Sequence, residues 1–244
     1  MSELYYAERA MARRLLLIST STVFGTKYLE HAFDELREVL AGARRVLFIP
    51  HALKDHTGYA AKARAAFEEI GFGLDSLHEA SDAQRAVREA EAVFCGGGNT
   101  FRLLDAIYRL DVAQLIRDRV GGGMPYTGAS AGSNLACPTI RTTNDMPIVE
   151  PPTLDALRLV AFQINPHYVD PVPDSTHMGE SRETRIREYH EENDCPVVGL
   201  REGAMLRVEG ESVELRGRAA ARIFRRGQEP VERAPVAPIE TLVE

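Results

Sequence analysis

A serine flanked only by small residues is the clearest chemical signal in the sequence. Residues 128–132 read Gly-Ala-Ser-Ala-Gly, which places Ser130 in a G-x-S-x-G pattern. A short apolar run leads into the pattern and a small-residue segment able to begin a helix follows, as in a nucleophile elbow. We expect the Ser130 hydroxyl to project above a sheet and the Ala131 N–H to point to where an oxyanion forms. The pattern alone is weak, so the partners of the serine decide what it means.

A serine hydroxyl becomes a good nucleophile only beside a base, and the base needs an acid to orient it. Among seven histidines, His167 is the best base, because a buried strand and an Asn-Pro turn precede it. His51 and His56 follow an earlier strand and rank second. Asp145 and Glu202 compete as the acid, and spacing does not choose between them. We interpret the other histidines as surface residues: His31, His78, His177 and His190.

Alternating strands and helices would position these residues. Strand-like apolar runs occupy 13–19, 44–50, 72–77 and 91–95, before the strand that enters the elbow. Apolar residues recur at helical spacing in five segments: 27–40, 55–70, a segment that begins at 81, another that begins near 101, and 111–120. This alternation predicts a parallel sheet covered on both faces, with its site at the carboxyl ends of the strands.

The second half of the chain is less regular. The sequence predicts an ordered loop over residues 138–152 and a charged helix over 180–192. It also predicts short strands, most of which should form antiparallel pairs at the C-terminal end: 159–165, 196–200, 204–208, 212–215 and 219–224. We predict a single domain over residues 1–226 and a flexible tail over 227–244.

Composition excludes several classes of protein. The 244 residues are 44% hydrophobic, with a net charge of −7 and no dense basic run, which argues against a nucleic-acid or membrane partner. Cys95, Cys137 and Cys195 lie far apart and lack C-x-x-C spacing, so we expect neither disulfide nor metal. We interpret Cys95 and Cys137 as small buried hydrophobes. The apolar run 15–18 is too short for a signal peptide or membrane span, so we expect a cytoplasmic protein without cofactor.

Six segments in order resemble the peptidase E family of serine peptidases, the alpha-aspartyl dipeptidases. They are residues 95–101, 128–138, 139–148, 163–167, 179–185 and 199–203, and the resemblance runs from about residue 14 to residue 226. The resemblance implies a class I glutamine-amidotransferase-like α/β fold. That fold is a three-layer α/β/α arrangement around a doubly wound, mostly parallel sheet, here with a short antiparallel C-terminal extension.

The resemblance also implies an activity, the hydrolysis of dipeptides and some short peptides that begin with aspartate. Ser130 matches the nucleophile and His167 the base. We favour Glu202 over Asp145 as the orienting acid. Attack would give an acyl-enzyme, and backbone N–H groups of Ala131 and of Gly98 (or its neighbour in the glycine loop) would hold the oxyanion.

An N-terminal aspartate carries two charges that the site must recognise. The ammonium needs an acceptor, for which Asp145, Glu150 or a backbone carbonyl could serve. The carboxylate suits a guanidinium fork, and the motif 179–185 offers Arg182 and Arg185. Asn99, at the end of the glycine loop, is a further substrate-binding candidate.

Two other functions stay open on the sequence. A cyanophycinase-like hydrolase would share the fold and the serine but cut aspartate–arginine linkages, and a catalytically silent binding module could use the same scaffold.

Ala129 departs from the bulky aromatic that family members often carry before the nucleophile, which leaves the strictness of aspartate selection open. The sequence also leaves open whether the chain forms a homodimer.

Overall fold

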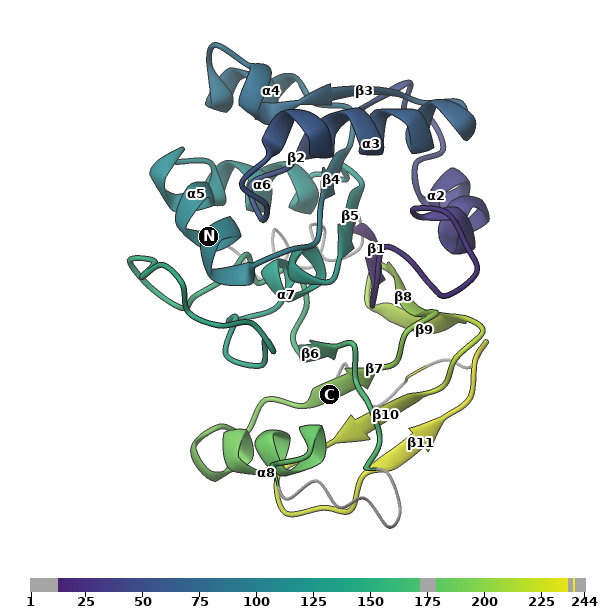
Figure 1. Cartoon of the computed structure of the whole chain (residues 1–244), viewed down its shortest axis with the longest axis vertical. Helices are drawn as coiled ribbons and strands as arrows, with labels where there is room; N and C mark the ends of the chain where they lie inside the picture. The colour runs from purple at the N-terminus through teal and green to yellow at the C-terminus, as the bar shows by residue number, and fades with distance from the viewer. Residues whose placement is uncertain (1–12, 172–178, 237–238, 240–244) are drawn as a thin grey trace.

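A large sheet of seven strands, in the order β3-β2-β4-β5-β1-β8-β9, forms the centre of the protein (Figure 1). The computed structural model describes residues 13–171, 179–236 and 239. The strands are β1 (Arg14–Ile18), β2 (Arg45–Ile49), β3 (Gly73–Ser76), β4 (Val93–Cys95), β5 (Tyr126–Ala129), β8 (Ala204–Glu209) and β9 (Ser212–Gly217). The first five run parallel, and β8 pairs antiparallel with both β1 and β9.

Helices cover both faces of this sheet, because successive strand residues are apolar and point to opposite sides. In β1, Leu15 and Leu17 join one buried cluster, whereas Leu16 and Ile18 join another. The helices are η1 (Glu30–Ala32), α2 (Phe33–Val39), α3 (His56–Glu69), η2 (Leu77–Glu79), α4 (Ala83–Glu89), α5 (Thr100–Arg109), α6 (Ala113–Gly121) and α7 (Ala131–Ala136). Helices α2 and α3 pack on one face, and α4 to α7 on the other.

A second sheet follows, in the order β11-β10-β7-β6. Its strands are β6 (Gln163–Pro166), β7 (Val197–Leu200), β10 (Ala221–Phe224) and β11 (Val231–Arg233), and helix α8 (Arg182–Glu192) packs against it through Ile186. Strands β6 and β7 are parallel, and the other pairs are antiparallel. Figure 1 shows this sheet and α8 together, away from α3 to α6.

The predicted elements are largely present, with differences that have local causes. The helix expected from residue 27 begins later, because Leu29 has a φ of +60° and its N–H bonds Ser21 instead. The strand expected at 159–165 shortens to β6, because the N–H groups of Leu159 and Val160 bond the Ala136 carbonyl. Strand β11 lies within residues 227–244, where the sequence predicts a tail and no strand. The strands predicted for the antiparallel C-terminal extension are divided between the two sheets.

Within the described residues, no helix is both long and apolar enough to cross a membrane. The same residues contain no group of three or more histidine, cysteine, aspartate or glutamate side chains that could hold a metal ion.

Candidate active site

Ser130 stands on a strained turn between β5 and α7. Its backbone has a φ of +52° and a ψ of −106°, and its N–H bonds the carbonyl of Ile18, which ends β1. The turn leaves no room beside it, since a Cβ on Gly132 would lie 2.1 Å from the Cys95 carbonyl oxygen. One on Gly128 would lie 2.5 Å from the Gly132 oxygen. The small residues of the pattern therefore allow a geometry that exposes the serine hydroxyl.

His167 and Glu202 meet Ser130 from the second sheet. The Nε2 atom of His167 lies 2.9 Å from Ser130 Oγ, and its Nδ1 atom lies 2.9 Å from Glu202 Oε1. The two residues come together because β6 and β7 are parallel neighbours, with Pro166 opposite Leu200. His167 is the first residue after β6, and Glu202 is the second after β7. Their side chains therefore leave the same edge of the sheet.

Ser19 ties the two sheets together, although the sequence did not single it out. It follows β1 directly and is fully buried. Its hydroxyl donates to the Leu200 carbonyl at 2.7 Å and accepts the His167 N–H at 3.0 Å. One serine of the large sheet thus fixes the backbone of the histidine. A polar residue at the carboxyl end of a buried strand was the available signal.

Two backbone N–H groups near Ser130 are the ones that the sequence predicts for an oxyanion hole. Ala131 begins α7 and Gly98 lies in the glycine loop after β4, and neither N–H donates a hydrogen bond within the described part of the chain. Gly97 differs, because its backbone hydrogen-bonds the Tyr59 hydroxyl. Burial raises the pKa of Tyr59, and that hydrogen bond opposes the shift. Gly98 has a φ of +136°, and a Cβ there would lie 2.7 Å from the Ala52 oxygen, so glycine is required.

A cavity of about 400 Å³ opens beside Ser130 and His167. The glycine loop forms one wall, and Tyr28, Tyr59 and Lys62 form another. Lys62 carries no signal in the sequence, because a lysine in an alanine-rich helix is usually a solvated surface residue.

Asp145 does not contact the histidine. Its Oδ2 atom accepts hydrogen bonds from the N–H and hydroxyl of Thr100, at 2.8 and 2.6 Å, and lies 3.0 Å from the Thr143 hydroxyl. No described residue donates to its Oδ1 atom. Asn99 is the N-cap of α5, accepting from the Arg102 N–H at 3.0 Å and donating to the Met146 carbonyl at 2.8 Å. Both residues hold the loop 139–148 against the start of α5.

The two arginines of α8 differ in their surroundings. Arg182 is half-buried, and no ion pair of it is found within the described residues. Burial and the neighbouring Arg185 lower its pKa, whereas Asp145 acts in the opposite direction, so Asp145 lies within electrostatic reach. Arg185 is exposed and pairs with Glu180 at 3.4 Å. Glu150 is also exposed.

Among the described residues, His167 is the one histidine that hydrogen-bonds the hydroxyl of Ser130. His51 and His56 lie near the glycine loop with ring centroids 4.7 Å apart, and His78 is 5.6 Å from His56. The surface interpretation is wrong for His190, which is buried, whereas His31 and His78 are half-buried and His177 lies outside the described residues. Cys95 and Cys137 are fully buried, and burial raises the pKa of each thiol, to about 12 for Cys95.

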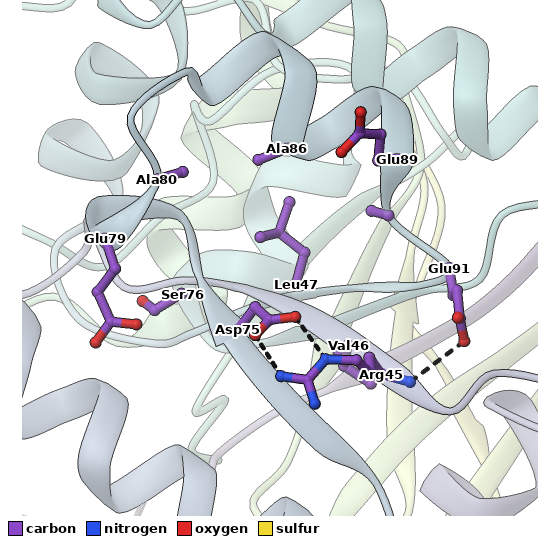
Figure 2. Close-up of a pocket in the computed structure, with 11 residues that line it drawn as sticks. Arg45, Val46, Leu47, Asp75, Ser76, Glu79, Ala80, Ala86, Glu89 and Glu91 are labelled. Atoms are coloured by element: carbon purple, nitrogen blue, oxygen red, sulfur yellow. Dashed lines mark hydrogen bonds and ion pairs between the residues drawn. The ribbon is translucent and has the colours of Figure 1, made fainter.

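A second cavity, of about 430 Å³, lies between β2, β3 and α4 (Figure 2). Figure 2 shows the Arg45 guanidinium directed at the Asp75 carboxylate, with which it pairs, and the Arg45 backbone bonded to Glu91. Glu79 and Glu89 line its rim. Its one serine, Ser76, is buried and lies 2.7 Å from His78 Nδ1, but the other ring nitrogen of His78 faces the Thr57 hydroxyl at 3.5 Å rather than a carboxylate. Arg45, the cation among the lining residues, is already paired with Asp75, so the cavity is a weaker candidate than the one beside Ser130.

A serine, histidine and carboxylate joined by hydrogen bonds at a nucleophile elbow are the arrangement of a serine hydrolase. Residues 15–216 match the model of Peptidase family S51. The chain is 53% identical over 230 residues to Peptidase E of Streptomyces coelicolor, covering 94% of this chain and 95% of that protein. It is 45% identical over 238 residues to a Drosophila melanogaster protein named probable alpha-aspartyl dipeptidase, covering 96% and 99%.

Solved structures agree on the fold. The crystal structure of a peptidase from an acI-B1 actinobacterium matches with a TM-score of 0.70 at 16% identity, covering 94% of this chain and 97% of that one. The chain belongs to peptidase family S51 and is a serine-type peptidase. The predicted fold class and family resemblance are confirmed.

Proposed function

We propose that this chain hydrolyses the peptide bond after an N-terminal aspartate in dipeptides, through an acyl-enzyme on Ser130. The observation that carries the proposal is the pair of 2.9 Å hydrogen bonds that join Ser130, His167 and Glu202. The names of the relatives in Streptomyces and Drosophila support the substrate class.

The hydrogen bonds support one proposed step for each side chain. His167 Nε2 takes the proton from Ser130 Oγ as the oxygen attacks the scissile carbonyl carbon. Glu202 accepts from Nδ1–H, which fixes the tautomer and stabilises the imidazolium. The N–H groups of Gly98 and Ala131 hold the oxyanion, and each such donor contributes about 3–4 kcal/mol to the transition state. His167 then protonates the leaving amine, and water resolves the ester by the same steps in reverse.

Recognition of the aspartyl residue is assigned to Asp145 and Arg182. The Oδ1 atom of Asp145 is available for the substrate ammonium, because Oδ2 takes the hydrogen bonds within the protein. The guanidinium of Arg182 is within electrostatic reach of this carboxylate and is suited to bind the substrate side chain in a fork. The two charged groups of an aspartyl residue would thus meet two opposite charges of the enzyme.

Steady-state hydrolysis of Asp-Leu tests the proposal. We expect turnover by the wild type, loss of at least about a thousandfold in kcat for Ser130→Ala, and an unchanged circular dichroism spectrum. A β-linked Asp-Arg dipeptide is the comparison substrate and should react far more slowly. Faster cleavage of that dipeptide, or comparable turnover by Ser130→Ala, would contradict the proposal.

A matched pair of variants tests the specificity assignment. Arg182→Ala should raise KM for Asp-Leu at least about tenfold, because a charge-assisted contact is lost. Arg185→Ala, which removes an exposed arginine of the same helix, should leave KM near its wild-type value. Equal loss of activity on Asp-Leu and Asn-Leu in Arg182→Ala would show that Arg182 does not read the aspartyl carboxylate.

A further inference from the structure

The cavity beside Ser130 contains a cation that the proposed chemistry does not use. Lys62 lies on the exposed side of α3, and its Nζ atom is 4.6 Å from the ring centroid of Tyr28. Both residues line the cavity together with Ser130 and His167. The described part of the chain contains no ion pair of Lys62. The one carboxylate that shares the cavity wall, Asp55, accepts the Gly58 N–H at 2.9 Å as the N-cap of α3.

Buried tyrosines connect this lysine with the glycine loop. The hydroxyls of Tyr28 and Tyr59 lie 3.2 Å apart, and a Cβ placed on Gly96 would lie 2.5 Å from the Tyr59 oxygen. The wall of the cavity therefore extends from the glycine loop, across two aromatic rings, to the ammonium of Lys62. An ammonium over an aromatic face, close to a bound anion, is only partly hydrated and attracts that anion more strongly than it would in bulk water.

The charges of the substrate can be matched one by one with charged groups of the protein. An Asp-X dipeptide has one ammonium and one carboxylate on its first residue and a second carboxylate on its last. Asp145 and Arg182, which are within electrostatic reach of each other, complement the first residue in the proposed function. Lys62 pairs with no acidic side chain of the described residues, so it suits a substrate residue that presents a carboxylate alone.

We propose that Lys62 binds the terminal carboxylate of the leaving residue and thereby selects dipeptides over longer or C-terminally blocked peptides. This inference rests on the proposed function and names a specificity-determining residue for it. In a dipeptide the terminal carboxylate lies within about 5 Å of the scissile carbonyl, and each further residue moves it by about 3.5 Å. A flexible lysine accommodates the first position, whereas a longer peptide carries its carboxylate past the cavity.

A blocked substrate provides the test. The values of kcat/KM for Asp-Leu and for Asp-Leu amide are measured for the wild type, Lys62→Met and Lys27→Met. We expect the wild type to prefer the free acid about tenfold or more, as a charge-assisted hydrogen bond would give. Lys62→Met should lose that preference through a higher KM for Asp-Leu alone. Lys27→Met removes the same charge from an exposed lysine that pairs with Glu69, and it should keep the preference.

The other results overturn the inference. An equal loss on both substrates in Lys62→Met would place Lys62 at the aspartyl residue or in the fold, and an unchanged preference would show that it binds neither carboxylate. Lys62→Arg, which keeps the charge, should retain the preference, and thermal unfolding of each variant separates misfolding from lost binding. If the wild type hydrolyses neither substrate, the proposed function fails and the inference with it. If the wild type hydrolyses both and Lys62→Met behaves like the wild type, only the inference fails.

Discussion

The two sheets hold their parts of the site by different means. The large sheet shapes backbone: it holds Ser130 at a φ of +52° and brings the Cys95 carbonyl against Gly132 so closely that no side chain fits. The second sheet places side chains, because the parallel register of β6 and β7 brings His167 and Glu202 to one edge. The proposed nucleophile is therefore fixed by steric exclusion, whereas the proposed base and acid are fixed by strand pairing and hydrogen bonds.

This difference between the sheets indicates where a single substitution should affect the site most. A turn fixed by close packing tolerates no added atom, but it depends little on any one hydrogen bond. A histidine at the end of a strand depends on the few contacts that orient it, and those contacts can be removed singly. Substitutions in the second sheet should therefore alter the chemistry while the fold persists.

Among the substitutions that probe this difference between the sheets, the largest effect is expected from neutralising the proposed acid of the second sheet. Glu202→Gln should lower kcat by roughly a hundredfold or more, since an amide does not stabilise the imidazolium and can hold the wrong tautomer. Asp145→Asn should act mainly on KM, because Asp145 is bonded to Thr100 rather than to His167. Steady-state kinetics with Asp-Leu measure both. A larger loss of kcat in Asp145→Asn would make Asp145 the orienting residue and remove Glu202 from that role.

A smaller effect is expected where the sheets meet. Ser19→Ala should lower kcat about tenfold with little change in KM, because the His167 N–H and the Leu200 carbonyl lose their shared partner. It should also lower the free energy of unfolding by about 1–2 kcal/mol. Thr127→Val is the matched control, since it removes a buried hydrogen bond to Val93 within the large sheet. If the two variants lose stability equally and neither loses kcat, Ser19 has no positioning role.

The smallest expected effect concerns His51, which hydrogen-bonds no carboxylate among the described residues. Burial, with His56 and His78 nearby, lowers the pKa of His51 to about 4, and its Nδ1 atom is buried without a partner among the described residues. Between about pH 6.5 and pH 4 only the unfolded chain binds the proton, so stability falls as the pH falls through that range.

His51→Gln should reduce this acid destabilisation by about 1–2 kcal/mol between pH 7.5 and pH 5, measured as the difference in free energy from urea unfolding. The same pH dependence in variant and wild type would show that His51 is no less basic in the folded chain. Kinetics at pH 7.5 should be nearly unchanged, in contrast to any substitution of His167.

The nucleophile elbow and the large sheet could be predicted from the sequence, because each is determined by residues that are close together in the chain. Apolar runs of strand length predict strands that are buried on both faces. A serine flanked by glycine and alanine predicts a turn that has no room for larger side chains. The candidate base was readable for the same reason, since His167 directly follows the strand that carries it.

Which carboxylate lies beside His167 could not be predicted from residue spacing, because it depends on a pairing between strands far apart in the sequence. Asp145 and Glu202 are equivalent as residue types. The parallel pairing of β6 with β7 brings Glu202 to His167, and the hydroxyl of Thr100 holds Asp145 away. Lys62 was missed for a related reason, since only the packing of α3 beside the glycine loop places it in the cavity.

Covalent labelling of the nucleophile tests the central claim, that a histidine of the second sheet activates a serine of the large sheet. Wild type and His167→Ala are treated with diisopropyl fluorophosphate, and the modified peptide is identified by mass spectrometry. We predict one label on Ser130 in the wild type and a labelling rate at least about a hundredfold slower in His167→Ala. A label on another residue, or equal rates in the two proteins, would contradict the account.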